Sequence, residues 1–185
     1  AKDVGKLFWL DIGGGEPFLR KDLVDIIEAF DAKVVQIPTN ASLQDHIFDA
    51  VKEMKKRIRG EITLSLDIDG FREYHDKVRG TPGNFDQVWD TFEKLRSIGG
   101  VRIKINTVVM QGFNDDELFD IIEFGKQVGA EVRFIEYMDV GGATLWSMER
   151  VFPKEEILSR LRSYYGNIEE ITGRGSSPAE RFRLP

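Results

Sequence analysis

The chain has 185 residues, the length of one domain with at most a short appendage, and its 41% hydrophobic and 31% charged residues are typical of a globular protein. Its net charge of −6 argues against a general nucleic-acid binder, and the absence of cysteine excludes disulfides, thiolate metal sites and a thiol nucleophile. No run of about 18 apolar residues and no secretory signal are visible, so we expect no membrane span and a cytoplasmic location.

Strand-like and helix-like segments alternate along the chain. Five short strands are predicted, beginning at residues 8, 34, 62, 101 and 131. Apolar residues with helical spacing lie between and after them, within residues 23–30, 43–58, 85–95, 118–125 and 157–164. Asn114 is predicted to cap a helix that begins with Asp115, Asp116 and Glu117, whose charges suit a helix N-terminus. The stretch from Gly70 to Asn84 is predicted as the longest loop, and His75 within it is given no role.

This alternation predicts an α/β fold. Strands joined through helices form right-handed βαβ units and a parallel sheet. The strands are too few for a full (βα) barrel, so we expect a partial (βα) barrel or an open, curved parallel sheet with outer helices. In either architecture the functional groups lie at the carboxyl ends of the strands. Residues 1–166 are predicted to form the (βα) core and residues 167–185 an extended C-terminal tail.

Small and polar residues follow or end every predicted strand. Glycines let a ligand approach the backbone closely, a glutamate suits an ammonium group, and a lysine beside an arginine suits phosphate or carboxylate. The residues concerned are Gly13 to Pro17 after the first strand, Thr39 and Asn40, Ser65 and Asp67, Lys104 and Asn106, and Arg133, Glu136 and Met138. Their recurrence at each strand end predicts one binding site along that edge of the sheet.

Each of these groups also has a purely structural interpretation. The glycines Gly13–Gly15 could make a tight turn that holds no ligand, and Thr39-Asn40 could be a loop turn or a helix cap. Lys104 and Arg133 could be paired with Glu131 or Asp139. The three tryptophans are expected to pack in the interior.

The sequence Gly14-Gly15-Glu16-Pro17 after one strand, followed by Thr39-Asn40 after the next, resembles the core of the radical SAM superfamily. In that family the GGEP stretch holds the amino group of S-adenosylmethionine, and later strands contact its carboxylate and ribose. The resemblance implies that the cofactor is bound by Gly14, Gly15, Glu16, Pro17, Thr39, Asn40, Ser65, Asp67, Asn106 and Met138.

The C-terminal half is similar to one branch of that superfamily. Residues 104–109, 114–118, 132–141 and 179–184 resemble the molybdenum cofactor biosynthesis protein A family, the GTP 3′,8-cyclases. The resemblance implies a lyase of molybdenum cofactor biosynthesis, in which a 5′-deoxyadenosyl radical made from S-adenosylmethionine abstracts a hydrogen from GTP. It also implies that Lys104 and Arg133 face the nucleotide, and it names no catalytic side chain in this chain.

The family's CxxxCxxC loop, which ligates a [4Fe–4S] cluster, is absent from these residues. We therefore expect a radical SAM-like core that lacks its first βα unit and is inactive as it stands. Residues 75–86 resemble peptide- or tetrapyrrole-modifying branches instead. The alternatives are such a branch, a cluster-free protein that binds S-adenosylmethionine or a nucleotide, and an interaction module that forms a homodimer through an exposed sheet edge.

Overall fold

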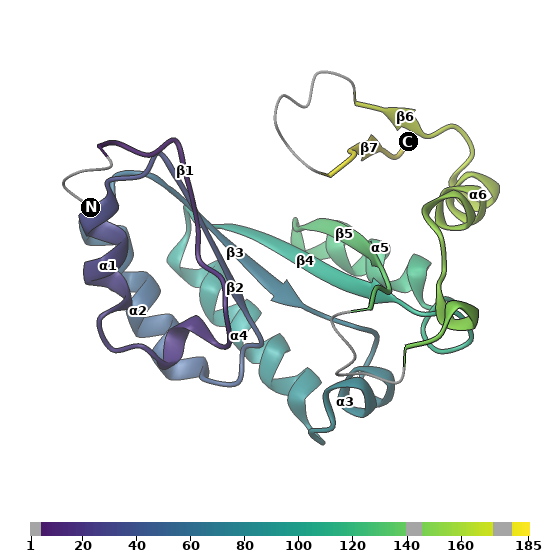
Figure 1. Ribbon diagram of the computed structural model, residues 1–185, viewed down its shortest axis with the longest axis horizontal. Helices are drawn as coiled ribbons and strands as arrows, with labels where there is room; N and C mark the ends of the chain where they lie inside the picture. The colour runs from purple at the N-terminus through teal and green to yellow at the C-terminus, as the bar shows by residue number, and fades with distance from the viewer. Residues whose placement is uncertain (1–4, 140–145, 172–178) are drawn as a thin grey trace. The chain divides into compact units, whose positions relative to one another are not determined.

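The computed structural model describes residues 5–139, 146–171 and 179–185, and its centre is a five-stranded sheet in the order β1-β2-β3-β4-β5 (Figure 1). Strands β1 to β4 pair in parallel, and β5 lies beside β4. The strands are β1 (Trp9–Asp11), β2 (Val34–Thr39), β3 (Glu61–Asp67), β4 (Arg102–Val109) and β5 (Glu131–Glu136). This confirms the predicted α/β class, as an open sheet rather than a closed barrel in the described residues.

Helices connect the strands along the chain. They are η1 (Pro17–Leu19), α1 (Leu23–Phe30), α2 (Gln44–Arg57), α3 (Glu73–Arg79), α4 (Asn84–Ile98), α5 (Leu118–Val128), η2 (Met148–Arg150) and α6 (Lys154–Tyr165), followed by the short strands β6 (Glu169–Glu170) and β7 (Phe182–Arg183). Figure 1 shows α1, α2 and α4 next to one another beneath β1 to β3.

The chain divides into two compact units. The first comprises residues 1–108 and 120–135 and holds most of the sheet; the second comprises residues 109–119 and 136–185. Within the second unit, Met110 bridges Val151, and Arg160 forms an ion pair with Asp115 at 2.9 Å. The predicted division at residues 166/167 stays a prediction.

The two faces of the sheet differ in chemistry because side chains alternate along each strand. Ile37, Leu64 and Ile105 are fully buried in a core shared with α1, α2, α4 and α5. The alternate residues form a polar face. Ser65 stands opposite Lys104 in the parallel register, and Asp67 stands opposite Asn106. The order of strands therefore aligns the polar residues predicted on β3 and β4.

Three local predictions were wrong. Residues Glu73–Arg79, assigned to a loop, form helix α3. Helix α5 begins at Leu118 rather than directly after Asn114, and the Oδ1 of Asn114 accepts a hydrogen bond from the Met110 amide at 2.7 Å. The fifth strand, which was expected to run from Glu131 to Met138, ends two residues earlier, at Glu136.

Strand β1 is an outer strand of the sheet in the described residues. Its neighbour Phe8 is 67% exposed and Trp9 is 45% exposed, so Trp9 does not pack in the interior as expected. An open edge of this kind can pair with another strand, and the homodimer through it stays a prediction. Across the ranges that the structure describes, no helix is long and apolar enough to cross a membrane.

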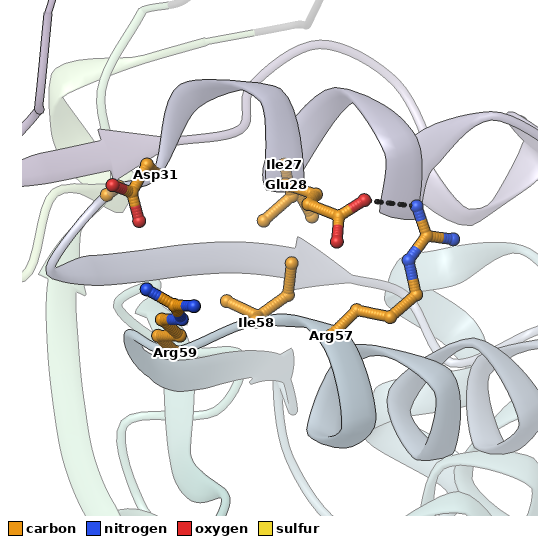
Figure 2. A pocket seen from close by; sticks show the side chains of 7 residues that line it. Ile27, Glu28, Asp31, Arg57, Ile58 and Arg59 are labelled. Atoms are coloured by element: carbon orange, nitrogen blue, oxygen red, sulfur yellow. Dashed lines mark hydrogen bonds and ion pairs between the residues drawn. The ribbon is translucent and has the colours of Figure 1, made fainter.

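A shallow pocket of about 280 Å³ lies at the amino ends of β2 and β3, where α1 and α2 end. Figure 2 shows Arg57 paired with Glu28 at its rim, and Arg57 also contacts Asp25 at 2.6 Å. Because ligands of parallel α/β sheets bind at the carboxyl ends of strands, this pocket lies at the end of the sheet opposite the predicted site.

Candidate functional site

Glu16 joins the ends of the first two strands. It lies between β1 and η1, and its Oε1 accepts hydrogen bonds from the Phe18 amide at 3.2 Å and from the Thr39 hydroxyl at 2.9 Å. Its Oε2 accepts the Asn40 amide at 2.8 Å. The carboxylate thus takes up three donors, one from η1 and two from the end of β2, and fixes the shape of the edge between them.

Thr39 and Asn40 are also bonded within the protein. The Thr39 hydroxyl accepts the Ala41 amide at 3.1 Å, and the Asn40 Oδ1 accepts the Ser42 amide at 3.0 Å. Together with Glu16, these side chains shape the loop after β2, so the structural interpretation accounts for their side-chain bonds. A ligand could therefore contact the backbone of this loop, whose position these side chains fix.

The glycine turn after β1 is open. A Cβ built on Gly13, Gly14 or Gly15 would meet no atom of residues 5–139, 146–171 or 179–185 within 4 Å. Gly14 has a φ of +111°, a conformation that residues with a side chain rarely adopt, whereas Gly13 and Gly15 have ordinary backbone angles. The buried Pro17 opens η1 directly after the turn. Packing therefore does not explain why positions 13 and 15 are glycine. A ligand that approaches the backbone closely would explain it.

Two buried oxygens on β3 and β4 have no hydrogen-bond partner among the described residues: Ser65 Oγ and Asn106 Oδ1. Ser65 is 1% exposed. A buried polar atom without a partner costs free energy, and such atoms in a native protein commonly meet a ligand or water. Both residues were predicted to bind the cofactor, and both lie on the polar face of adjacent strands.

Asp67 lies next to Asn106, and Arg79 forms ion pairs with both Asp67 and Asp69. The Asn106 Nδ2 donates to Asp67 Oδ1 at 3.3 Å, and Arg79 on α3 approaches Asp67 at 3.4 Å and Asp69 at 2.8 Å. Burial raises the pKa of the Asp67 carboxyl above its usual range, although Arg79 and Asn106 both act to lower it. Asp69 in turn accepts the Val108 amide at 3.1 Å.

His75 anchors α3 to the end of β3. It is fully buried; its Nδ1 accepts the Asp69 amide at 3.2 Å, and its Nε2 lies 2.9 Å from Asn84 Oδ1. Because Nδ1 accepts, Nε2 carries the proton, and the ring is neutral. The sequence analysis assigned no role to His75 or Arg79. Their i, i+4 spacing could have indicated that both lie on one face of a helix.

We expect the stability of the protein to depend on His75 below about pH 6.5. Burial lowers the pKa of His75 in the folded state, so on acidification the unfolded chain takes up a proton before the native protein does. Stability should therefore fall from the unfolded pKa downward, by up to about 1.4 kcal/mol per pH unit, until the folded pKa is reached. Urea unfolding of the wild type and His75→Gln between pH 7.5 and 5 measures this. The destabilisation of the variant should shrink with falling pH, and a constant difference would contradict the assignment.

Lys104 and Arg133 lie together on neighbouring strands. Lys104 Nζ is 3.7 Å from Glu131 Oε1, and Arg133 Nε is 3.4 Å from the same oxygen. Lys104 is only 6% exposed. The ion-pair alternative with Glu131 is thus confirmed for both cations.

Met138 belongs to the second compact unit and is 60% exposed. Its expected contact with the cofactor stays a prediction. The chain has no cysteine, and the described residues contain no group of three or more His, Asp or Glu side chains that could hold a metal ion. The residues present therefore do not fit an iron–sulfur cluster.

The fold is that of an α/β protein with a parallel sheet, in which an open glycine turn follows β1 and two unpartnered buried oxygens lie on the polar face of β3 and β4. Residues 10–125 match the family described as the radical SAM superfamily. The chain belongs to that superfamily, which confirms the resemblance seen in the GGEP and Thr39-Asn40 motifs.

The chain is similar to GTP 3′,8-cyclases. It is 44% identical to GTP 3′,8-cyclase 3 of Mycobacterium tuberculosis, over 93% of this chain and 46% of the relative. It is 34% identical to the GTP 3′,8-cyclase of Aquifex aeolicus, over 82% of this chain and 47% of the relative. The chain therefore spans about half the length of these relatives.

A solved structure of TYW1 with a lysine–pyruvate adduct bound has the same fold. It matches with a TM-score of 0.66 at 20% identity, over 88% of this chain and 52% of that chain. At this identity the likeness supports the architecture alone.

Proposed function

We propose that this chain binds S-adenosylmethionine at the carboxyl edge of β1 to β4, as the core of a radical SAM enzyme. The observation that carries the proposal is the pair of buried, unpartnered oxygens, Ser65 Oγ and Asn106 Oδ1. They can accept hydrogen bonds from an amino or hydroxyl group of a ligand. The open turn at Gly14 and Gly15, held by Glu16, offers backbone groups to the same ligand.

The second part of the proposal concerns the substrate. The relatives named above act on GTP by name, and Lys104 with Arg133 provides a site of the matching charge. A buried lysine beside an arginine suits a triphosphate, because charge-assisted hydrogen bonds to phosphate are strong. We therefore propose a guanine nucleoside triphosphate as the substrate, a small molecule rather than a nucleic acid.

When bound and reductively cleaved, S-adenosylmethionine supplies a 5′-deoxyadenosyl radical that abstracts hydrogen. The role of this chain is to hold and orient its ligands. Glu16 fixes the turn, Ser65 and Asn106 accept hydrogen bonds, and Lys104 and Arg133 neutralise phosphate charge. No step is assigned to an iron–sulfur cluster, because no cysteine in the chain could ligate one.

Calorimetric titration of the 185-residue chain with S-adenosylmethionine, and separately with GTP, tests both parts of the proposal. We expect saturable binding of each, with GTP affinity falling as salt is raised because phosphate contacts are screened. Binding of S-adenosylmethionine alone would support the cofactor site and contradict the nucleotide site. Binding of neither would contradict the whole proposal.

Changes to Glu131 and Lys104 should shift GTP affinity in opposite directions. Glu131→Gln removes the carboxylate that the two cations share at 3.7 Å and 3.4 Å, so GTP should bind more tightly, by about tenfold. Lys104→Met keeps most of the length of the side chain, removes its charge and should weaken GTP binding by at least about tenfold. The two Kd values are compared at one salt concentration, with S-adenosylmethionine affinity as the control. Equal GTP affinity in the two variants would show that these residues serve only the fold.

A further inference from the structure

The amide of Asn106 has a defined orientation. Its Nδ2 donates to Asp67 Oδ1 at 3.3 Å, which leaves Oδ1 as the buried atom without a partner. An amide turned the other way would place its oxygen against the Asp67 carboxylate, and two acceptors would then face each other. The direction in which Asn106 presents its acceptor therefore depends on the charge of Asp67.

We propose that Asp67, held by Arg79, is a positioning residue that keeps the acceptor of Asn106 directed at the ligand. The ligand must then present a hydrogen-bond donor at this point, either a ribose hydroxyl or an amino group. The inference rests on the proposed S-adenosylmethionine site and adds to it the residues that determine its donor and acceptor pattern.

The contacts around Asp67 suit this role. Arg79 pairs with Asp67 at 3.4 Å and with Asp69 at 2.8 Å, and Asp69 is itself held by the Val108 amide on β4. The two ion pairs of Arg79 thereby attach α3 to the end of β3. The charged and hydrogen-bonding groups that act on Asp67 are Arg79 on α3, Asp69 after β3 and Asn106 on β4.

Burial already raises the pKa of Asp67, and Arg79 opposes the rise. Without Arg79 the carboxyl would take up a proton more readily. A protonated Asp67 could donate to Asn106 Oδ1, and the amide would then be free to turn its NH₂ group toward the ligand. Arg79 thus keeps Asp67 an acceptor and Asn106 in the orientation found.

A ligand-and-variant cycle tests the proposal on the full chain. The probes are S-adenosylhomocysteine and three analogues that lack the 2′-hydroxyl, the 3′-hydroxyl or the amino group. In the wild type one analogue should bind more weakly than the parent, by roughly 2- to 12-fold. Asp67→Asn should bind S-adenosylhomocysteine as weakly as the wild type binds that analogue. In Asp67→Asn, removing the same donor group from the ligand should weaken binding no further. If removal of the donor group weakens binding equally in the wild type and in Asp67→Asn, the proposal is overturned. In that case the change in the ligand and the substitution of Asp67 act independently, as a merely structural role of Asp67 requires.

Asp90→Asn is the matched control, since it makes the same chemical change at an exposed position of α4. It should leave all four affinities unchanged. Arg79→Gln is the second variant and should reduce the discrimination in the same way while leaving the Asp67 carboxyl in place. Thermal unfolding of each variant confirms that the compared proteins are folded.

A second readout needs no ligand and no variant of Asp67. The side-chain NH₂ resonance of Asn106 should titrate with Asp67 in the free protein, and its midpoint should move to higher pH in Arg79→Gln. A resonance that does not titrate would overturn the orientation. Failure of the parent probe to bind the wild type would instead count against the proposed function, and this titration then decides the positioning role by itself.

Discussion

Replacing Glu16 with alanine is expected to lower both the stability of the protein and its affinity for S-adenosylmethionine. The change leaves the Phe18 amide, the Thr39 hydroxyl and the Asn40 amide without their acceptor. Hydrogen bonds to a charged group are worth about 1.5–3 kcal/mol each, but these are partly exposed and act together, so we expect a loss of about 2–4 kcal/mol. The melting temperature should fall by roughly 5–15 °C.

A second variant, Glu16→Gln, should separate the effect on stability from the effect on affinity. Glu16→Gln keeps one acceptor but sets its NH₂ group against a backbone or hydroxyl donor, so its stability should lie between those of the wild type and Glu16→Ala. The affinity for S-adenosylmethionine should fall at least about tenfold in both variants, because the backbone of the turn is no longer held. Glu149→Ala, at an exposed position of η2, is the control. If folded Glu16→Gln binds S-adenosylmethionine as tightly as the wild type does, the hydrogen bonds accepted by Glu16 do not contribute to ligand binding.

The alternation of strands and helices was readable because it is a local property. Runs such as Val34–Thr39 alternate buried and partly exposed residues, and helices such as α2 place Ile47, Val51 and Met54 at helical spacing toward the core. The sequence also placed Lys104 and Arg133 on adjacent strands. It could not decide whether they meet a carboxylate, and the distances to Glu131 decided that.

Partners, by contrast, could not be read from residue types. Glu16, Thr39 and Asn40 have the side chains of a binding site, yet their side-chain bonds in the structure are to one another and to neighbouring backbone. Helix α3 was missed because His75 is its single buried residue and the rest of its seven residues lack an apolar stripe. His75 acts through its contacts with Asp69 and Asn84, and these contacts form only in the folded protein.

Two glycines separate the requirements of the fold from those of the site. A Cβ on Gly60 would lie 2.2 Å from the carbonyl oxygen of Ala32 and 2.9 Å from that of Lys33. Both atoms belong to the backbone before β2, so neither can move aside as a side chain could. We expect Gly60→Ala to destabilise the protein by about 3–5 kcal/mol, which marks the effect of a glycine that packing requires.

Gly15→Ala should show the opposite result: an unchanged fold and a lost ligand. The backbone of Gly15 is ordinary and no atom lies within 4 Å of the added carbon, so the melting temperature should equal that of the wild type or rise slightly. If S-adenosylmethionine occupies the space over the turn, the methyl group stands in its place, and affinity should fall by at least about tenfold. Calorimetry and thermal unfolding on the same sample measure both quantities. A Gly15→Ala protein that binds as the wild type does would show that the glycines form a tight turn and nothing more.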